Sequence, residues 1–377
     1  MDFLLKHGNG NPRNSEGALI QLADGRLFFA YTRYNDPNGC WRDAASADIY
    51  AMTSADGGQN WSEPFPAVRN DAQNVMSVSL LRLQDGRIAM VYSRKSPVPG
   101  YSLMDCRPFI RFSSDEAQSW SEPTEIADVP FIYLVNRNDS LVQLRSGRLI
   151  LPVSWHPYIS KQSSGQGIGL YFLSDDGGVS WRRSRECCYP HRSLARGLME
   201  PGVAELKDGR LLGWFRTTNG CQYKTYSYDQ GETWNEPIPA SEFPSPSSPL
   251  VMKHDPEDGA LTAVWNDYSP IRSVRFMGGV IGRTPLVLAK SHDEGLTWTD
   301  HQVLEDAPDH GFAYTAMLFA GRSLYLAYCC GGLDSCECML QDLKIREIRL
   351  HDDTPPAAKE PGMDSRLKSE EALRECL

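Results

Sequence analysis

The sequence predicts an all-β protein, folded as a six-bladed β-propeller with four antiparallel strands in each blade. Three observations in its 377 residues support this prediction. One short motif occurs five times, a second motif interleaves with it, and the stretches between them have the length of short strands. Repeats of this size are typical of propellers and solenoids, in which each unit buries its apolar face against the next.

Each predicted blade begins with a hairpin. The stretches "LADGRLFFAY" (22–31), "LQDGRIAMVY" (83–92), "LRSGRLILPV" (144–153) and "LKDGRLLGWF" (206–215) place an Asp-Gly or Ser-Gly turn between two apolar runs, and weaker copies lie at 257–265 and 319–328. This is the strongest short-range signal for a hairpin. The turn glycines, at steps of 61, 61, 62, 50 and 62 residues, indicate six units: Gly25, Gly86, Gly147, Gly209, Gly259 and Gly321.

The second motif is Ser-x-Asp-x-Gly-x-x-Trp, which begins at Ser54, Ser113, Ser174, Ser227 and Ser291. The copy at Ser113 has Ala117 in the glycine position. An Asp side chain can accept hydrogen bonds from amides of its own turn, and Gly supplies a positive φ. We therefore expect this box to be a structural turn between the third and fourth strands, with its Trp filling the space between blades, rather than a catalytic element.

The remaining strands follow from these two landmarks. A third strand is expected before each box, as at 48–54, and a fourth after it, as at 62–68. The sixth unit has no box, its last strand is expected at 344–350, and residues around Phe3–Leu5 are expected to pair there and close the ring. Residues 1–353 are thus predicted to form a single propeller. Residues 354–377, which are Pro-rich and then charged, are predicted to be a flexible tail or short helix.

Composition narrows the range of partners. The net charge of −10 disfavours nucleic acid and anionic membranes as partners, but it does not exclude a small anion held by local arginines. The ten cysteines form no disulfide framework, and Cys336-x-Cys338 lacks zinc-ligand spacing, so no metal is expected. Residues 1–14 do not resemble a signal peptide and no stretch approaches a membrane span, which predicts a cytoplasmic protein. The sequence does not indicate an oligomeric state.

Strand order places both repeated turns on one rim of the propeller. The starts of the first strands and the ends of the second strands therefore meet on the other rim, where we expect function. Several arginines there, together with carboxylates and a tyrosine, indicate a site that binds an anion and performs acid–base chemistry. Ordinary rim salt bridges are the alternative for any single residue of this set: Arg13, Arg33, Asp36, Asp43, Asn74, Arg137, His156, Glu200, Arg216, Arg283 and Tyr314.

At about residues 10–350 the sequence resembles the sialidase (neuraminidase) superfamily, also known as BNR or Asp-box proteins. In "MEPGVAELKDGRLLGWFR" the resemblance implies Glu200 as the partner of a nucleophile and Arg216 as a carboxylate ligand. In "GRTPLVLAKSHDEGLTW" it implies Arg283 as a second carboxylate ligand, and in "AYTAMLFAGRSLYLAY" it implies Tyr314 as the nucleophile.

Two further segments are similar to the same superfamily at the N-terminus. "NPRNSEGALIQLADGRL" implies Arg13 as the remaining carboxylate ligand, although Asn14 and Ser15 stand where the superfamily usually has Ile-Pro. "RDAASADIYAMTSADGG" implies Asp43 as the acid/base, with Asp36 and Asp48 as competitors.

The resemblance implies a retaining exo-α-sialidase that removes terminal sialic acid, or a related 2-keto sugar acid, from a glycan without a metal or cofactor. Its site would comprise Tyr314, Glu200 and Asp43 as catalytic residues and, as substrate-binding residues, Arg13, Arg216, Arg283, Arg33, Asp36, Asn74, Arg137 and His156. Two alternatives stay open. One is a propeller hydrolase or lyase acting on another acidic sugar such as a uronic acid, for which His156 and Trp155 would matter more. The other is a carbohydrate-binding propeller without turnover.

Overall fold

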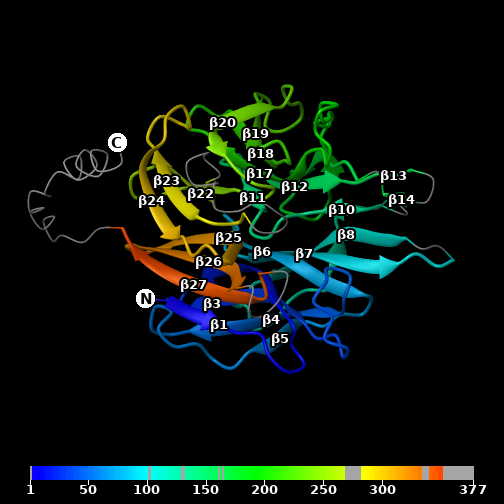
Figure 1. The fold of residues 1–377 in the computed structure, drawn as a ribbon, viewed down its shortest axis with the longest axis vertical. Coiled ribbons are helices and arrows are strands. Elements are labelled where there is room, and N and C mark those ends of the chain that lie inside the picture. The colour runs from blue at the N-terminus through cyan, green and yellow to red at the C-terminus, as the bar shows by residue number, and fades with distance from the viewer. Residues whose placement is uncertain are drawn as a thin grey trace, which may run out of the picture.

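The computed structural model describes residues 2–350 apart from 101–102, 128, 130–131, 160–161, 164, 268–281 and 333–338. Six sheets lie around a common axis, a separate two-stranded sheet accompanies them, and the neighbouring strands of each sheet are antiparallel (Figure 1). The predicted six-bladed β-propeller is therefore confirmed. The predicted tail at 354–377 and the pair Cys336 and Cys338 lie outside the described residues.

Blades 1, 2 and 4 follow the predicted order of strands. Blade 1 contains β2 (Asn14–Gln21), β3 (Leu27–Tyr34), β4 (Ala47–Ser54) and β5 (Phe65–Val68). Blade 2 contains β6 (Asn74–Arg82), β7 (Ile88–Pro97), β8 (Met104–Ser113) and β9 (Thr124–Glu125). Blade 4 contains β17 (Met199–Glu205), β18 (Leu211–Arg216), β19 (Cys221–Ser227) and β20 (Ile238–Pro244).

Blade 3 departs from this plan because its first strand is split. Two short pieces, β10 (Leu134–Val135) and β11 (Val142–Gln143), both pair with β12 (Leu149–Trp155), which is followed by β15 (Ile168–Ser174) and β16 (Arg182–Arg183). A separate hairpin of β13 (Tyr158–Ile159) and β14 (Gln162–Ser163) interrupts the blade.

Blade 5 again has four strands in the predicted order. They are β21 (Val251–His254), β22 (Leu261–Asn266), β23 (Leu286–Ser291) and β24 (Thr299–Glu305).

The ring closes through the N-terminus. Blade 6 contains β25 (His310–Ala320), β26 (Ser323–Gly332) and β27 (Asp342–Arg349), and its outer strand is β1 (Asp2–Leu5). Phe3 of β1 lies opposite Ile345 of β27, as predicted for the closing strand, and Figure 1 shows the two strands side by side. Arg346 of β27 donates to both carboxylate oxygens of Asp2 at 3.0 and 2.7 Å, which adds an ion pair to the ladder.

The apolar cores lie between the blades. Each of the six large clusters of buried side chains draws on two neighbouring blades, for example Ile20 and Phe28 of blade 1 with Val78 and Met90 of blade 2. Every blade thus buries both faces, which explains why the strands are rich in Leu, Val, Ile and Phe.

The boxes form the turns predicted from their sequence. In blade 4 the Ser227 hydroxyl donates to Asp229 at 2.9 Å, and Asp229 accepts the Thr233 amide at 2.9 Å. Gly231 has a φ of 88°. Trp234 stacks on Tyr171 of blade 3 with ring centroids 3.9 Å apart. The box is therefore a closed structural unit that joins two blades.

Candidate active site

The innermost strands carry an unusual backbone feature at the centre of the propeller. Five residues at equivalent positions have a left-handed backbone without being glycine, namely Glu16, Ser77, Asp139, Glu200 and Tyr314, with φ values of 39°, 58°, 51°, 43° and 58°. In four of these blades the strand register shifts at this point, which marks a β-bulge. Such backbone costs about 1–3 kcal/mol per residue and gathers at functional sites.

The bulges of blades 4 and 6 bring together three of the predicted residues. The Tyr314 hydroxyl donates to Glu200 Oε1 at 3.1 Å, and Arg216 Nη1 donates to both Glu200 oxygens at 2.8 and 2.9 Å. The same nitrogen lies 3.2 Å from the Tyr314 oxygen. Burial, followed by the charge of Glu200, raises the pKa of Tyr314, so the phenol is neutral at ordinary pH. A neutral hydroxyl that donates to a carboxylate has the geometry that a nucleophile and its general base require.

Arg13 and Asp43 form a second group on the blade 1 side. Arg13 is 5% exposed and donates to Asp43 Oδ1 at 2.7 Å and to Ser15 Oγ at 2.8 Å. The Asp43 side chain is 64% exposed and stands at the edge of the site. Desolvation by the surrounding protein would raise the pKa of Asp43 even at this exposed edge, but the positive charges of Arg13 and Lys95 outweigh it and hold that pKa at about 2. Asp43 is therefore ionised while Arg13 is its partner.

These groups face one cavity of about 710 Å³ at the centre of the propeller. Arg283 also faces it, with its guanidinium 5.3 Å from the centre of the Tyr314 ring. His156 also lines the cavity, and there burial, followed by the charge of Arg196, lowers its pKa to about 4 and keeps the imidazole neutral. The predicted residues that line the cavity are Arg13, Asp43, His156, Glu200, Arg216, Arg283 and Tyr314.

The other predicted residues do not line this cavity. The Arg33 guanidinium lies over the Tyr50 ring, 4.7 Å from its centre. The Asp36 carboxylate accepts hydrogen bonds from the backbone amides of Asn38 and Cys40 within its own turn. Asn74 is buried, and its side-chain amide donates to the carbonyl oxygens of Asp43 and Ala45 at 2.8 and 2.9 Å. Asn74 thus supports the loop that carries Asp43.

Two more residues from the sequence analysis lie in the protein interior. Arg137 is 2% exposed and donates to the carbonyl oxygen of Asp139 at 3.3 Å. Trp155 packs into the apolar cluster between blades 2 and 3 rather than into the cavity. The aromatic rings at the cavity, besides that of Tyr314, belong to Trp41, Tyr133 and Tyr158.

Three charged residues at the cavity were absent from the predicted site. Glu16 sits on the blade 1 bulge, Lys95 lies two residues before the end of β7 and close to Asp43, and Arg196 lies in the segment between blades 3 and 4. The strand-start rule could have found Glu16, because it directly follows Arg13-Asn14-Ser15. Arg196 lies outside both repeated motifs, so no periodic signal marks it.

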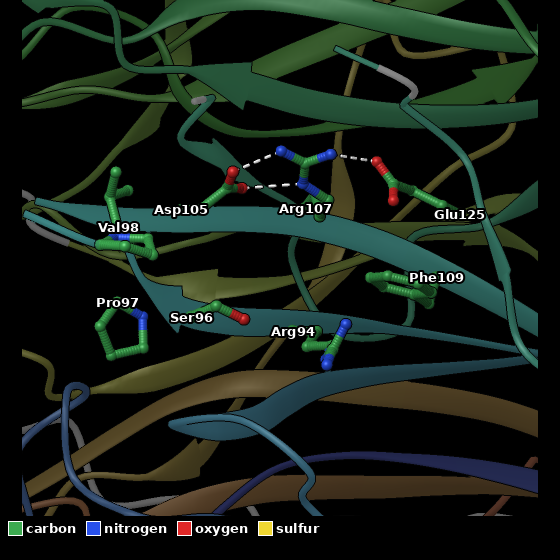
Figure 2. Close-up of a pocket in the computed structure, with 9 residues that line it drawn as sticks. Arg94, Ser96, Pro97, Val98, Asp105, Arg107, Phe109 and Glu125 are labelled. Atoms are coloured by element: carbon green, nitrogen blue, oxygen red, sulfur yellow. Dashed lines mark hydrogen bonds and ion pairs between the residues drawn. The ribbon is translucent and has the colours of Figure 1, made fainter. Parts of the chain in front are cut away.

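A smaller cavity of about 260 Å³ lies on blade 2, lined mainly by β7 and β8. Figure 2 shows Arg107 between Asp105 and Glu125, with both carboxylates bonded to its guanidinium. Arg94 pairs with Asp71 at 2.8 Å. Because its charges neutralise one another and no predicted residue lines it, this cavity is a poor candidate for the active site.

The described residues contain no cluster of His, Cys, Asp or Glu side chains arranged to hold a metal ion. Within the same part of the chain, no helix has the length and apolar character needed to cross a membrane.

Comparison with known proteins matches residues 100–326 to the model of the BNR repeat-like domain, which is more than half of the chain. The chain belongs to this family. A curated relative is the anhydrosialidase of Macrobdella decora, which is 28% identical over 140 residues. That alignment spans 34% of this chain and 16% of the relative, so it covers only a small part of that protein.

Solved structures show the same fold at low identity. A protein of unknown function from Dyadobacter fermentans has a TM-score of 0.74 at 15% identity and covers 93% of this chain and 98% of its own. The Hadza microbial sialidase Hz136 has a TM-score of 0.71 at 17% identity and covers 93% of this chain and 68% of its own. These structures confirm the predicted propeller fold, and the family match confirms the predicted BNR repeat.

Proposed function

We propose that the protein is a retaining exo-α-sialidase that removes a terminal sialic acid, or a closely related 2-keto sugar acid, from a glycan. The observation that carries the proposal is the hydrogen-bonded group of Tyr314, Glu200 and Arg216 at the floor of the cavity. A neutral phenol suits a substrate that is itself a carboxylate, because a carboxylate nucleophile would repel it. Sialidases are the glycosidases that use a Tyr nucleophile in this way.

Arg13, Arg216 and Arg283 would hold the substrate carboxylate. All three line the cavity, and guanidinium groups keep their charge while they bind a carboxylate through two parallel hydrogen bonds. Arg283 has no carboxylate partner among the described residues, where Ser247 accepts its one hydrogen bond. The cavity therefore keeps positive charge available for an anionic ligand.

In the first step Tyr314 Oη would attack the anomeric carbon and pass its proton to Glu200, while Asp43 protonates the departing oxygen. Asp43 must first become an acid, and its ion pair with Arg13 opposes this. A substrate carboxylate that takes over Arg13 would remove that opposition and raise the pKa of Asp43. In the second step Asp43 would take a proton from water as the water oxygen attacks the anomeric carbon, the tyrosyl–sugar bond would break, and Glu200 would return its proton to Tyr314 Oη.

The role of Asp43 can be tested with Asp36→Asn as a matched control. Asp43→Asn should lower kcat/KM, which reports the first step, by about 10²–10⁴-fold on sialyllactose, the usual contribution of a general acid. Its kcat/KM should fall much less on 4-methylumbelliferyl α-sialoside, because that leaving group departs without a proton. Asp36→Asn changes a carboxylate that accepts hydrogen bonds within its own turn and should leave kcat/KM on both substrates within about twofold of wild type.

Two results would contradict the proposal. Folded wild type that releases no sialic acid from either substrate, but cleaves a glucuronide, would move the function to uronic acids. An equal loss on both substrates in Asp43→Asn would remove Asp43 as the acid.

A further inference from the structure

Glu16 is a second carboxyl group on the cavity floor, and neither the nucleophile pair nor the acid/base employs it. It lies on the bulge of blade 1, at the position that corresponds to Glu200 in blade 4 and Tyr314 in blade 6. The same kind of β-bulge that directs the Glu200 and Tyr314 side chains into the cavity therefore directs Glu16 there, and Glu16 lines the cavity. Its neighbour Gly17 has no room for a side chain, since a Cβ there would lie 2.4 Å from the Phe29 ring.

The Glu16 carboxyl is buried and sparsely bonded. The residue is 4% exposed, and within the described part of the chain the Ser77 hydroxyl is the hydrogen-bond partner of its carboxyl, at Oε2. Asp139, at the equivalent position of blade 3, differs in both respects, because it pairs with Lys253 at 2.8 Å, accepts the Met317 amide at 2.9 Å and does not line the cavity. Both Asp139 oxygens have partners that stabilise the fold, whereas the Glu16 carboxyl has an oxygen available to bind a ligand.

We propose that Glu16 is a specificity-determining residue that meets the anionic group of the substrate as a neutral carboxylic acid and donates a hydrogen bond to it. This inference rests on the proposed function, in which that anion sits against Arg13 on the same floor. An ionised carboxylate at this place would repel the ligand, while a protonated one adds a donor that arginines alone do not supply. Proteins keep buried carboxylic acids neutral for such hydrogen bonds.

The surroundings of Glu16 support a neutral acid. Burial, followed by the negative charge of Asp43, raises its pKa to about 7, against the opposing charge of Arg13. Lys95 and the Glu200–Arg216 pair are the other charged groups that act on or near it. Tyr34, Tyr314 and Cys329 also face it, and burial raises the pKa of each, so none of them titrates between pH 6 and 8.

Proton uptake on binding tests this role. Binding of N-acetylneuraminic acid is measured by calorimetry from pH 6 to 9 in buffers of different ionisation enthalpy, with wild type, Glu16→Gln and Ser77→Ala. Wild type should take up close to one proton per site at pH 8–9, and its affinity should fall about tenfold per pH unit once Glu16 ionises in the free protein. Glu16→Gln, which keeps a donor that does not titrate, should take up about one proton fewer per site than wild type at pH 8–9, and its affinity should vary less than about twofold over that range.

Ser77→Ala keeps the test decisive if Glu16→Gln does not fold. The Ser77 hydroxyl donates to the carboxyl and favours its ionised form, so its loss should move the fall in affinity to higher pH. Wild-type affinity that is constant from pH 6 to 9, the same pH dependence in Glu16→Gln, or no shift in Ser77→Ala would overturn the inference.

Sialoside hydrolysis on the same samples separates this inference from the proposed function. Proton-linked binding without hydrolysis would refute the proposed reaction and retain Glu16. Hydrolysis with binding that takes up no proton would refute the role of Glu16 alone, and the absence of both binding and hydrolysis at every pH would refute both proposals.

Discussion

The aspartates of the box rim differ sharply from one carboxyl group on the cavity side, that of Glu16. On the box rim, Asp56, Asp115, Asp176 and Asp293 accept hydrogen bonds from their own turns, which hold the pKa of each at about 2. On the cavity floor, burial raises the pKa of Glu16 to about 7. Carboxylates satisfied within a local turn stabilise the fold, whereas a carboxyl that lacks such partners at a strained bulge is kept for a ligand.

The largest effect on stability is expected on the box rim. Trp234 is 8% exposed, stacks on Tyr171 and donates to the Gly231 carbonyl at 3.1 Å. Trp234→Ala should lower the free energy of unfolding by about 3–5 kcal/mol, because it leaves a cavity between blades 3 and 4. Urea denaturation measures this, and kcat/KM of the folded variant at low temperature should stay within about twofold of wild type. Loss of turnover in folded Trp234→Ala would contradict the claim that the box rim serves stability while the cavity side serves function.

A smaller effect with a distinctive pH signature is expected from Glu16. Its folded pKa lies above the unfolded value of 4.5, so its contribution is fully present below pH 4.5 and is lost as the pH rises through about 7. The difference in unfolding free energy between wild type and Glu16→Gln should therefore change by about 3 kcal/mol between pH 4 and pH 8, to the disadvantage of wild type at pH 8.

The contribution of the box aspartates to stability changes with pH in the opposite direction. Their contribution is present above pH 3.8 and is lost as the pH falls towards about 2. Denaturation curves at several pH values would show both trends. A difference between wild type and Glu16→Gln that is constant from pH 4 to pH 8 would contradict the assignment of Glu16.

The smallest effect is expected at a box glycine. Gly58 has a φ of 88°, and a Cβ there would meet its nearest neighbour, Tyr325, at 3.6 Å without a clash. Gly58→Ala should lower the free energy of unfolding by about 1 kcal/mol through backbone strain alone. Ala117, which occupies the same box position in blade 2 with a φ of 64°, shows that the turn accepts this substitution. A loss of more than about 3 kcal/mol would mean that the glycine does more than permit the turn.

Most of the fold could be predicted from the sequence because the propeller repeats its local signals. The Asp-Gly turns, the boxes and the closing strand at Asp2–Leu5 each have local sequence causes, and the structure confirms them. The split first strand of blade 3 was not predicted, because β10 and β11 are only two residues each. The motif that begins each blade does not reveal such a break.

The candidate site could be predicted in part. Tyr314, Glu200 and Arg216 carry superfamily motifs and meet as expected. Polarity at a strand end was a weaker guide, because Arg137 and Asn74 use the same polarity to satisfy buried backbone. Glu16 is set apart by a bulge, and a bulge is a property of strand pairing that no single strand reveals.

The central claim is that the bulged Tyr314 is a nucleophile with Glu200 as its base, and a trapped intermediate tests it most directly. A sialosyl fluoride with a second fluorine on the neighbouring ring carbon forms the covalent intermediate faster than water can release it. Intact mass spectrometry of the quenched protein should show one sugar per chain, mapped by peptide analysis to Tyr314 and absent from Tyr314→Phe. An adduct on Glu16 or Glu200, or none in a protein that hydrolyses sialosides, would contradict the account.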